Sequence, residues 1–321
     1  YIRFMRGLKF VIIMALSLYA TTFVSANNYE EDFRGGRRID LWNVDNMPNS
    51  RNMQLRDSVV NHRTWQIGMP RLYVYQPCSD NRTNTAVILI PGGGYAKQAY
   101  EAAGITMVQW LNSIGVTAFV LLHRLPTSPD LIEREKAPLQ DAQRAVRYVR
   151  AHASEYGVEK IGVMGCSAGG HLAACVSTIV EDVSNVGDSI DGYSFRPDFS
   201  ILISPVITMV DELTNKGSRN ALLGEKPCND MVDRYSMEKQ VTKDNPPMLF
   251  IHASDDRAVS PMNSVMMYSA LIEKGVKQSS LHIFPFGKHA IAMRRQPGTT
   301  AMWPEIAEGW MKEIGCLSNE K

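Results

Sequence analysis

Apolar and polar residues alternate in blocks along the chain, in a pattern that predicts strands followed by helices. Short apolar runs predict buried strands, and longer stretches with apolar residues three and four apart predict amphipathic helices. The predicted strands cover residues 65–76, 86–90, 116–122, 161–164, 199–203, 248–252 and 279–284. The predicted helices cover residues 100–113, 139–152, the stretch after Gly169, 262–274 and 303–314. Strands that alternate with helices predict an α/β fold, whose mostly parallel, doubly wound sheet carries helices on both faces.

Two polar segments interrupt this alternation. Residues 27–57 are rich in asparagine and glycine, with an aromatic patch near Leu41 and Trp42, and we expect them to lie on the domain as an extended arm. Residues 211–247 separate two predicted core strands and show only short helical turns. We expect this second segment, called the cap segment below, to form a small insertion across the carboxyl edge of the sheet.

The first residues have the pattern of an export signal. Three basic residues precede an apolar run over residues 10–24, which is short for a membrane span, and Val24-Ser25-Ala26 offers small residues for cleavage. This pattern predicts a secretory signal peptide over residues 1–26, with translation starting at Met5, and a secreted or periplasmic domain over residues 27–321. An uncleaved membrane anchor is the alternative. After cleavage we expect no association with a membrane.

The overall charge excludes some classes of partner. The chain of 321 residues has 34 basic and 33 acidic residues, interspersed, for a formal net charge of +1. Without a basic stripe, we expect no nucleic-acid partner. No CxxC or HExxH pattern occurs, so a zinc site is unsupported, and the serine chemistry inferred below needs no metal or organic cofactor. Export would permit disulfides, but an odd number of cysteines leaves at least one thiol unpaired within the chain. The cysteines are Cys78, Cys166, Cys175, Cys228 and Cys316.

The most informative stretch is residues 160–174, which reads K-I-G-V-M-G-C-S-A-G-G-H-L-A-A. An apolar strand turns through a G-x-S-x-G pattern into a helix, which is the setting of a nucleophile elbow. Gly165 and Gly169 flank Ser167 because a side chain at either position would clash where the strand packs on the helix. The turn exposes the Ser167 hydroxyl and directs the N–H of Ala168 toward a developing oxyanion. The alternative is a glycine-rich turn with a solvated serine.

Cys166 is a competing nucleophile beside this serine. A nucleophile at residue 166 would place Met164 and Ala168 at the two small flanking positions, and Met164 does not fit there. We therefore expect Cys166 to pack beside the turn as a small apolar residue.

A second glycine-rich loop follows the strand predicted over residues 86–90 and reads Pro91-Gly92-Gly93-Gly94-Tyr95. Consecutive glycines let the backbone approach a bound group, and in this setting they supply the other half of an oxyanion hole, from Gly93 or Gly94. Tyr95 offers an aromatic edge for contact with substrate. A flexible loop or a phosphate cradle is the alternative, although no GxxxxGK[ST] pattern is present.

A nucleophilic serine needs a base and an orienting acid, which in this fold follow in the order serine, acid, histidine. His289 follows the last predicted strand, whereas His252 and His282 lie inside strands. His171 lies one helical turn after the serine, where we expect it to pack or bond locally. The acid must come from the turn that contains Asp255 and Asp256, and the pattern alone leaves both open.

Together these motifs make the chain resemble the alpha/beta-hydrolase superfamily and, within it, secreted carbohydrate esterases of the acetylxylan-esterase and feruloyl-esterase-like group. In that group the acid stands in a D-x-x-V-P turn before an Asn-Ser pair, which implies Asp256. Cys166, Ser260 and Ala290 depart from the group's usual residues. The segments that carry the resemblance are residues 91–95, 141–145, 165–173, 246–247, 256–260, 263–264 and His289.

The resemblance implies a serine carboxylesterase that removes short acyl groups, acetate first, from an acylated polysaccharide or oligosaccharide such as plant-wall xylan. Ser167, Asp256 and His289 would act through an acyl-enzyme. A feruloyl esterase is one alternative. A peptidase of the prolyl-oligopeptidase kind is a second, although too few residues precede the first core strand for a propeller domain. A non-catalytic carbohydrate-binding module is the third.

Overall fold

The structure is a computed structural model that describes residues 29–289, 291–294 and 296–318. The chain divides into two compact units, residues 1–34 and 35–321. In the first unit, the described residues contain the short helix α2 (Tyr29–Asp32). The predicted signal peptide lies outside the described residues. In the part of the chain that is described, no helix is long and apolar enough to cross a membrane.

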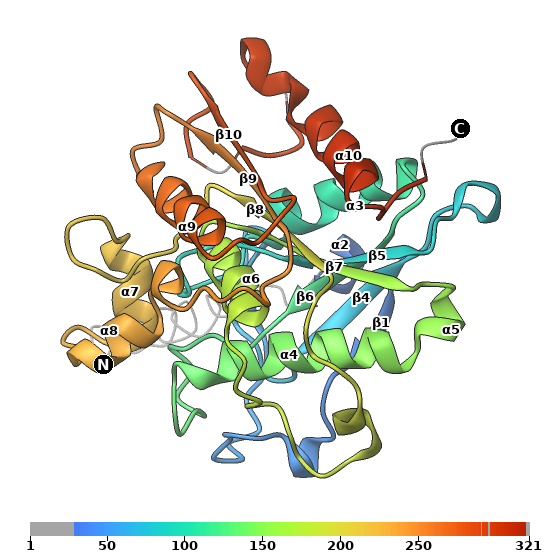
Figure 1. The fold of residues 1–321 in the computed structure, drawn as a ribbon. Coiled ribbons are helices and arrows are strands. Elements are labelled where there is room, and N and C mark those ends of the chain that lie inside the picture. Colours follow the sequence, from blue (N-terminus) through green and yellow to red (C-terminus); the bar gives the residue numbers. More distant parts are fainter. Residues whose placement is uncertain (1–28, 290, 295, 319–321) are drawn as a thin grey trace, which may run out of the picture. The chain divides into compact units, whose positions relative to one another are not determined.

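The second unit is built around a sheet that has eight strands within the described residues (Figure 1), in the order β1-β4-β6-β5-β7-β8-β9-β10. The neighbours from β6 to β10 pair in parallel, and β1 and β4 join one edge antiparallel. The predicted α/β class with a mostly parallel sheet is therefore confirmed. The strands are β1 (Arg37–Asp40), β4 (Arg71–Tyr75), β5 (Thr85–Ile90), β6 (Thr117–Leu122), β7 (Lys160–Cys166), β8 (Phe199–Ile203), β9 (Met248–Ala253) and β10 (Ser280–Phe284).

Helices cover both faces of this sheet. Figure 1 shows α3 and α10 on one face and α4, α6 and α9 on the other. Because neither face meets water, the central strands are rich in apolar residues, and β5 and β9 are buried along their whole length. The helices are α3 (Thr106–Ser113), α4 (Lys136–Ala151), α5 (Ala153–Tyr156), α6 (Ala168–Thr178), α7 (Lys216–Leu223), α8 (Asn229–Arg234), α9 (Met262–Glu273) and α10 (Trp303–Glu313).

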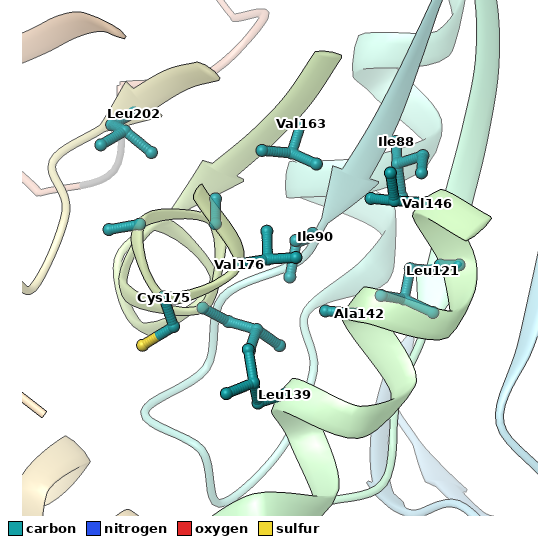
Figure 2. Close-up of a cluster of buried hydrophobic side chains, with 14 of the residues drawn as sticks. Ile88, Ile90, Leu121, Leu139, Ala142, Val146, Val163, Cys175, Val176 and Leu202 are labelled. Atoms are coloured by element: carbon teal, nitrogen blue, oxygen red, sulfur yellow. The ribbon is translucent and has the colours of Figure 1, made fainter. Parts of the chain in front are cut away.

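The core beneath α4 and α6 fixes these helices against the strands. Leu139, Ala142 and Val146 of α4 are three and four residues apart, so they share one helical face. Figure 2 shows that face turned toward Ile88 of β5, in a cluster that also includes residues of α6. All these side chains are buried, and this packing sets the position of α6 on the sheet.

The segment predicted as an extended arm contributes an edge strand, which corrects that prediction. Strand β1 pairs antiparallel with β4, and its sequence Arg-Arg-Ile-Asp lacks the apolar run that would have revealed it. Next to it, Trp42 is buried, and its indole N–H donates to Asp141 at 2.8 Å. Arg124 also donates to Asp141 at 2.8 Å, so this buried cluster ties the segment to α4.

The single strand predicted over residues 65–76 is wrong, because two strands occupy this stretch. β3 (Arg63–Gln66) pairs with β2 (Ser58–Val60) in a separate two-stranded sheet, and β4 begins only at Arg71. Gly68 lies between them, and a Cβ there would come within 1.9 Å of the Leu55 carbonyl oxygen. The helix predicted over residues 100–113 also divides: its first turn, Glu101–Ile105, is π-helical and leads into α3.

Candidate active site

The polar residues singled out in the sequence meet at one edge of the sheet. Strands β5, β7, β9 and β10 run parallel, so their carboxyl ends lie at the same edge. Each of these ends leads directly to one of the candidate groups. They are the glycine loop (residues 92–94) after β5, Ser167 after β7, Asp256 after β9 and His289 after β10.

The turn at Ser167 has the strained geometry of a nucleophile elbow. Its φ and ψ of 57° and −122° are unfavourable for a residue with a Cβ. A Cβ on Gly165 would lie 2.2 Å from the Gly169 carbonyl oxygen, and one on Gly169 would lie 2.1 Å from that of Ile90. The close packing that we predicted for both glycines is present, and it holds Ser167 between the strand and the helix.

Ser167, His289 and Asp256 form a continuous chain of hydrogen bonds. The Ser167 hydroxyl lies 2.9 Å from Nε2 of His289, and Nδ1 of His289 lies 2.7 Å from Oδ2 of Asp256. An ionised carboxylate can only accept, so Nδ1–H donates to Asp256 and Nε2 accepts from the serine. The other carboxylate oxygen, Oδ1, accepts the N–H groups of Ala258 and Val259 at 2.9 and 3.0 Å. Both oxygens of Asp256 are thereby held in place.

Asp256 remains a carboxylate although it is buried. Burial by itself would raise its pKa, but hydrogen bonds from His252, His289 and the Val259 N–H outweigh it and hold the pKa well below the usual range. A folded-state pKa below the unfolded value of about 3.9 means that ionised Asp256 stabilises the fold above that pH. This contribution is lost as the pH falls through the lower, folded-state pKa.

Asp255 and His252 form further contacts with the segments that hold His289 and Asp256. Oδ1 of Asp255 accepts the N–H of Lys288 at 2.8 Å, so it holds the turn before His289 instead of the imidazole. His252 is buried, with Nδ1 2.8 Å from the Ser264 hydroxyl and Nε2 3.3 Å from Oδ2 of Asp256. His252 was not predicted from the sequence to belong to the site. Its spacing of four residues from Asp256, across the end of β9, was the available signal.

The side chain of Tyr95, which we predicted to contact substrate, is not among the residues that line the cavity beside Ser167. Its side chain is buried at 2% exposure, and its hydroxyl donates to Nδ1 of His171 at 2.8 Å. Nε2–H of His171 then donates to the carbonyl of Tyr235 in the cap segment, also at 2.8 Å. Burial lowers the pKa of His171 to about 4, so the ring is neutral and can accept from the tyrosine. Tyr95 therefore joins the glycine loop to α6 and the cap segment, and His171 has the local bonding role that we expected.

A cavity of about 370 Å³ opens beside Ser167 and His289. Much of its wall consists of small residues, and the beginning of the cap segment supplies polar ones. These cap residues were not predicted from the sequence, because no local pattern of residues indicates where an irregular segment lies in the fold. Asn215 accepts the Ser218 N–H at 2.9 Å, which caps α7 at the edge of the cavity. The lining residues are Gly92, Gly93, Gly94, Lys97, Ala99, Ala102, Ala103, Cys166, Ser167, Asn215, Ser218, His289 and Ala292.

Cys166 is part of this wall but is poorly suited to act as a nucleophile. Burial raises the pKa of its thiol to about 12, so the reactive thiolate is scarce at neutral pH. All five cysteines have free thiols in the structure. Of the departures from the esterase pattern, Ala290 lies outside the described residues.

Comparisons with known proteins extend this description. The model of the BD-FAE family matches residues 72–271, which is more than half of the chain. Endo-1,4-beta-xylanase B of Butyrivibrio fibrisolvens is 33% identical over 245 residues, 75% of this chain and 36% of that protein. An acetylxylan esterase of Xylanibacter ruminicola is 34% identical over 216 residues, 65% of this chain and 42% of that protein. This chain spans less than half the length of these curated relatives.

A solved structure resembles nearly the whole chain. The acetyl ester-xyloside bifunctional hydrolase from Caldicellulosiruptor lactoaceticus superposes with a TM-score of 0.73 at 35% identity, covering 88% of this chain and 98% of that one. The chain therefore belongs to the BD-FAE family, and its fold is that of the alpha/beta hydrolases.

Proposed function

We propose that the protein is a serine carboxylesterase that removes acetyl and other short acyl groups from a plant-wall polysaccharide such as xylan. The observation that carries this proposal is the hydrogen-bonded chain from Ser167 through His289 to Asp256, with the serine at the wall of a cavity. The names of the relatives support the substrate class, since they are a xylanase, an acetylxylan esterase and an acetyl ester-xyloside hydrolase.

In the proposed reaction Ser167 attacks the ester carbonyl while His289 takes its proton. Asp256 holds the imidazole in the required tautomer and stabilises the imidazolium. The N–H groups of Ala168 and of Gly93 or Gly94 bind the oxyanion, and losing one such donor typically costs about 100- to 1000-fold in rate. His289 then returns the proton to the leaving sugar hydroxyl, which leaves an acyl-serine. Water attacks the acyl-serine by the same route and releases the carboxylic acid.

We predict that the rate on a nitrophenyl ester series falls as the acyl chain lengthens from two to twelve carbons. The acyl group and the alcohol part of the ester must both fit in a cavity of about 370 Å³, and forcing a longer acyl chain into a site of limited volume is costly. The same preparation should release acetate from acetylated xylan faster than it releases ferulate from a feruloylated substrate. A maximum at eight carbons or more without acetate release would indicate a lipase-like enzyme, and the reverse order of acids would indicate a feruloyl esterase.

We also propose that residues 1–26 are a signal peptide and that the esterase acts outside the cytoplasm, where its polysaccharide substrate would be found. The basic start, the apolar run and the small residues before Asn27 support this proposal. Expression of the full chain in a bacterial host should yield exported protein whose first residue is Asn27 by N-terminal sequencing. Exported material that retains residues 10–24 would contradict cleavage and favour an anchor.

A further inference from the structure

Two neighbouring side chains, one of them in the cavity wall, have no part in the reaction described above. Lys97 lines the cavity that contains Ser167. Its ammonium lies 4.4 Å from the centre of the Trp65 ring, a cation–π contact. Trp65 is 45% exposed, so part of its ring remains open to solvent. A large aromatic side chain that is so exposed, and that contacts a residue of the cavity wall, is a candidate contact for a ligand.

The backbone explains why these two side chains meet. Thr64 of β3 and Gln98 form an antiparallel bridge, with N–H to carbonyl distances of 3.0 and 2.8 Å. In an antiparallel pair the next residues outward also face each other, which places Trp65 opposite Lys97. Thr64 and Gln98 are buried, and because successive side chains alternate, Trp65 and Lys97 point away from the core.

The same segment is joined to the glycine loop. The N–H of Lys97 donates to the Gly93 carbonyl at 3.2 Å, and the N–H of Ala99 donates to the Gly92 carbonyl at 2.8 Å. The positions of Lys97 and Trp65 are therefore coupled to the backbone that we propose as an oxyanion donor. A group bound by these two side chains would have a defined place relative to Ser167.

Lys97 brings a positive charge to the wall of the cavity. Within the described residues, Lys97 forms no ion pair, and no aspartate or glutamate is among the residues that line the cavity. A neutral substrate would leave this ammonium without a counter-charge. A carboxylate on the substrate would provide one, and it would also be attracted toward the site from solution.

We propose that Lys97 and Trp65 form a subsite for an anionic sugar next to the acylated sugar. The apolar C–H face of a pyranose ring would lie on the exposed part of the indole, and the ammonium of Lys97 would pair with a uronic acid carboxylate. The proposal rests on the proposed function and adds the substrate class: acetylated polysaccharide that carries uronic acid substituents.

The test compares two acetylated xylo-oligosaccharides of equal length, one with a glucuronic acid branch and one without. We expect wild-type kcat/KM for acetate release to be about two- to fivefold higher on the acidic substrate at low salt, with the difference shrinking as ionic strength rises. Lys97→Gln should bring the ratio to one, whereas Lys97→Arg should keep most of it. Damage to the reacting groups lowers both rates alike, so it leaves this ratio unchanged.

The contribution of Trp65 is tested with a second ratio. Trp65→Ala should lower kcat/KM on both oligosaccharides relative to nitrophenyl acetate by about two- to tenfold. Tyr193→Ala is the matched control, because Tyr193 is 44% exposed and its carbonyl accepts from Arg147 of α4, a helix that contributes no residue to the cavity wall. In this control the ratio should stay at the wild-type value.

Three experimental results would overturn the proposal of this subsite. The first is a wild-type enzyme that does not distinguish the two oligosaccharides, and the second is a ratio that survives Lys97→Gln. In both cases the esterase function itself stands, because acetate is still released. The third is an enzyme that hydrolyses nitrophenyl acetate but neither oligosaccharide, which would overturn the proposed xylan substrate together with the subsite.

Discussion

Ser167→Ala is expected to abolish ester hydrolysis while the protein remains folded. In the proposed reaction the Ser167 hydroxyl is the attacking group, and among the described residues no other hydroxyl is hydrogen-bonded to Nε2 of His289, so we expect a loss of about 10⁴-fold or more in kcat. His289→Ala should have a similar effect, because the two groups act as one unit. Hydrolysis of nitrophenyl acetate measures the loss, and circular dichroism with thermal unfolding checks the fold.

The neighbouring thiol supplies the control for this experiment. Cys166→Ala should retain activity within about tenfold, because the thiol is protonated at neutral pH and only forms part of the cavity wall. A serine-directed phosphonate should label the wild type at Ser167 and leave Ser167→Ala unlabelled, which also separates an enzyme from a binding module. Activity of Ser167→Ala within tenfold of the wild type would refute the assignment.

Asp256→Asn is expected to lower kcat by roughly 10³- to 10⁴-fold. The carboxylate accepts from Nδ1–H of His289 at 2.7 Å, and an asparagine that donates to Nδ1 would leave the proton on the nitrogen that must accept from Ser167. The imidazolium formed during the reaction would also lose its counter-charge. Steady-state kinetics on nitrophenyl acetate measure the change.

Asp255→Asn is the matched comparison, since it makes the same chemical change one residue earlier. Its Oδ1 accepts the Lys288 N–H, and an asparagine oxygen can do the same, so we expect a loss below about tenfold. If Asp255→Asn were the more damaging variant, the orienting acid would have to be reassigned to Asp255.

The sequence by itself determined the fold class and the order of the candidate groups. Parallel strands buried on both faces consist mostly of apolar residues, so β5, β7, β8 and β9 are visible in the sequence as apolar runs bounded by turns. The glycines around Ser167 were also predictable, because a strand that turns directly into a helix leaves no room for a Cβ. Local sterics and local hydrophobicity carry this information.

Only the tertiary structure decided which groups face one another. Asp255 and Asp256 are chemically identical neighbours, and the path of the chain after β9 and β10 turns Asp256 toward His289. Tyr95 appeared open from its position after three glycines, but His171 and the Tyr235 carbonyl, distant in sequence, enclose and bond it. Lys97 meets Trp65 only because a short antiparallel bridge joins two distant segments. Such contacts depend on packing between segments far apart in the chain, which no local pattern of residues encodes.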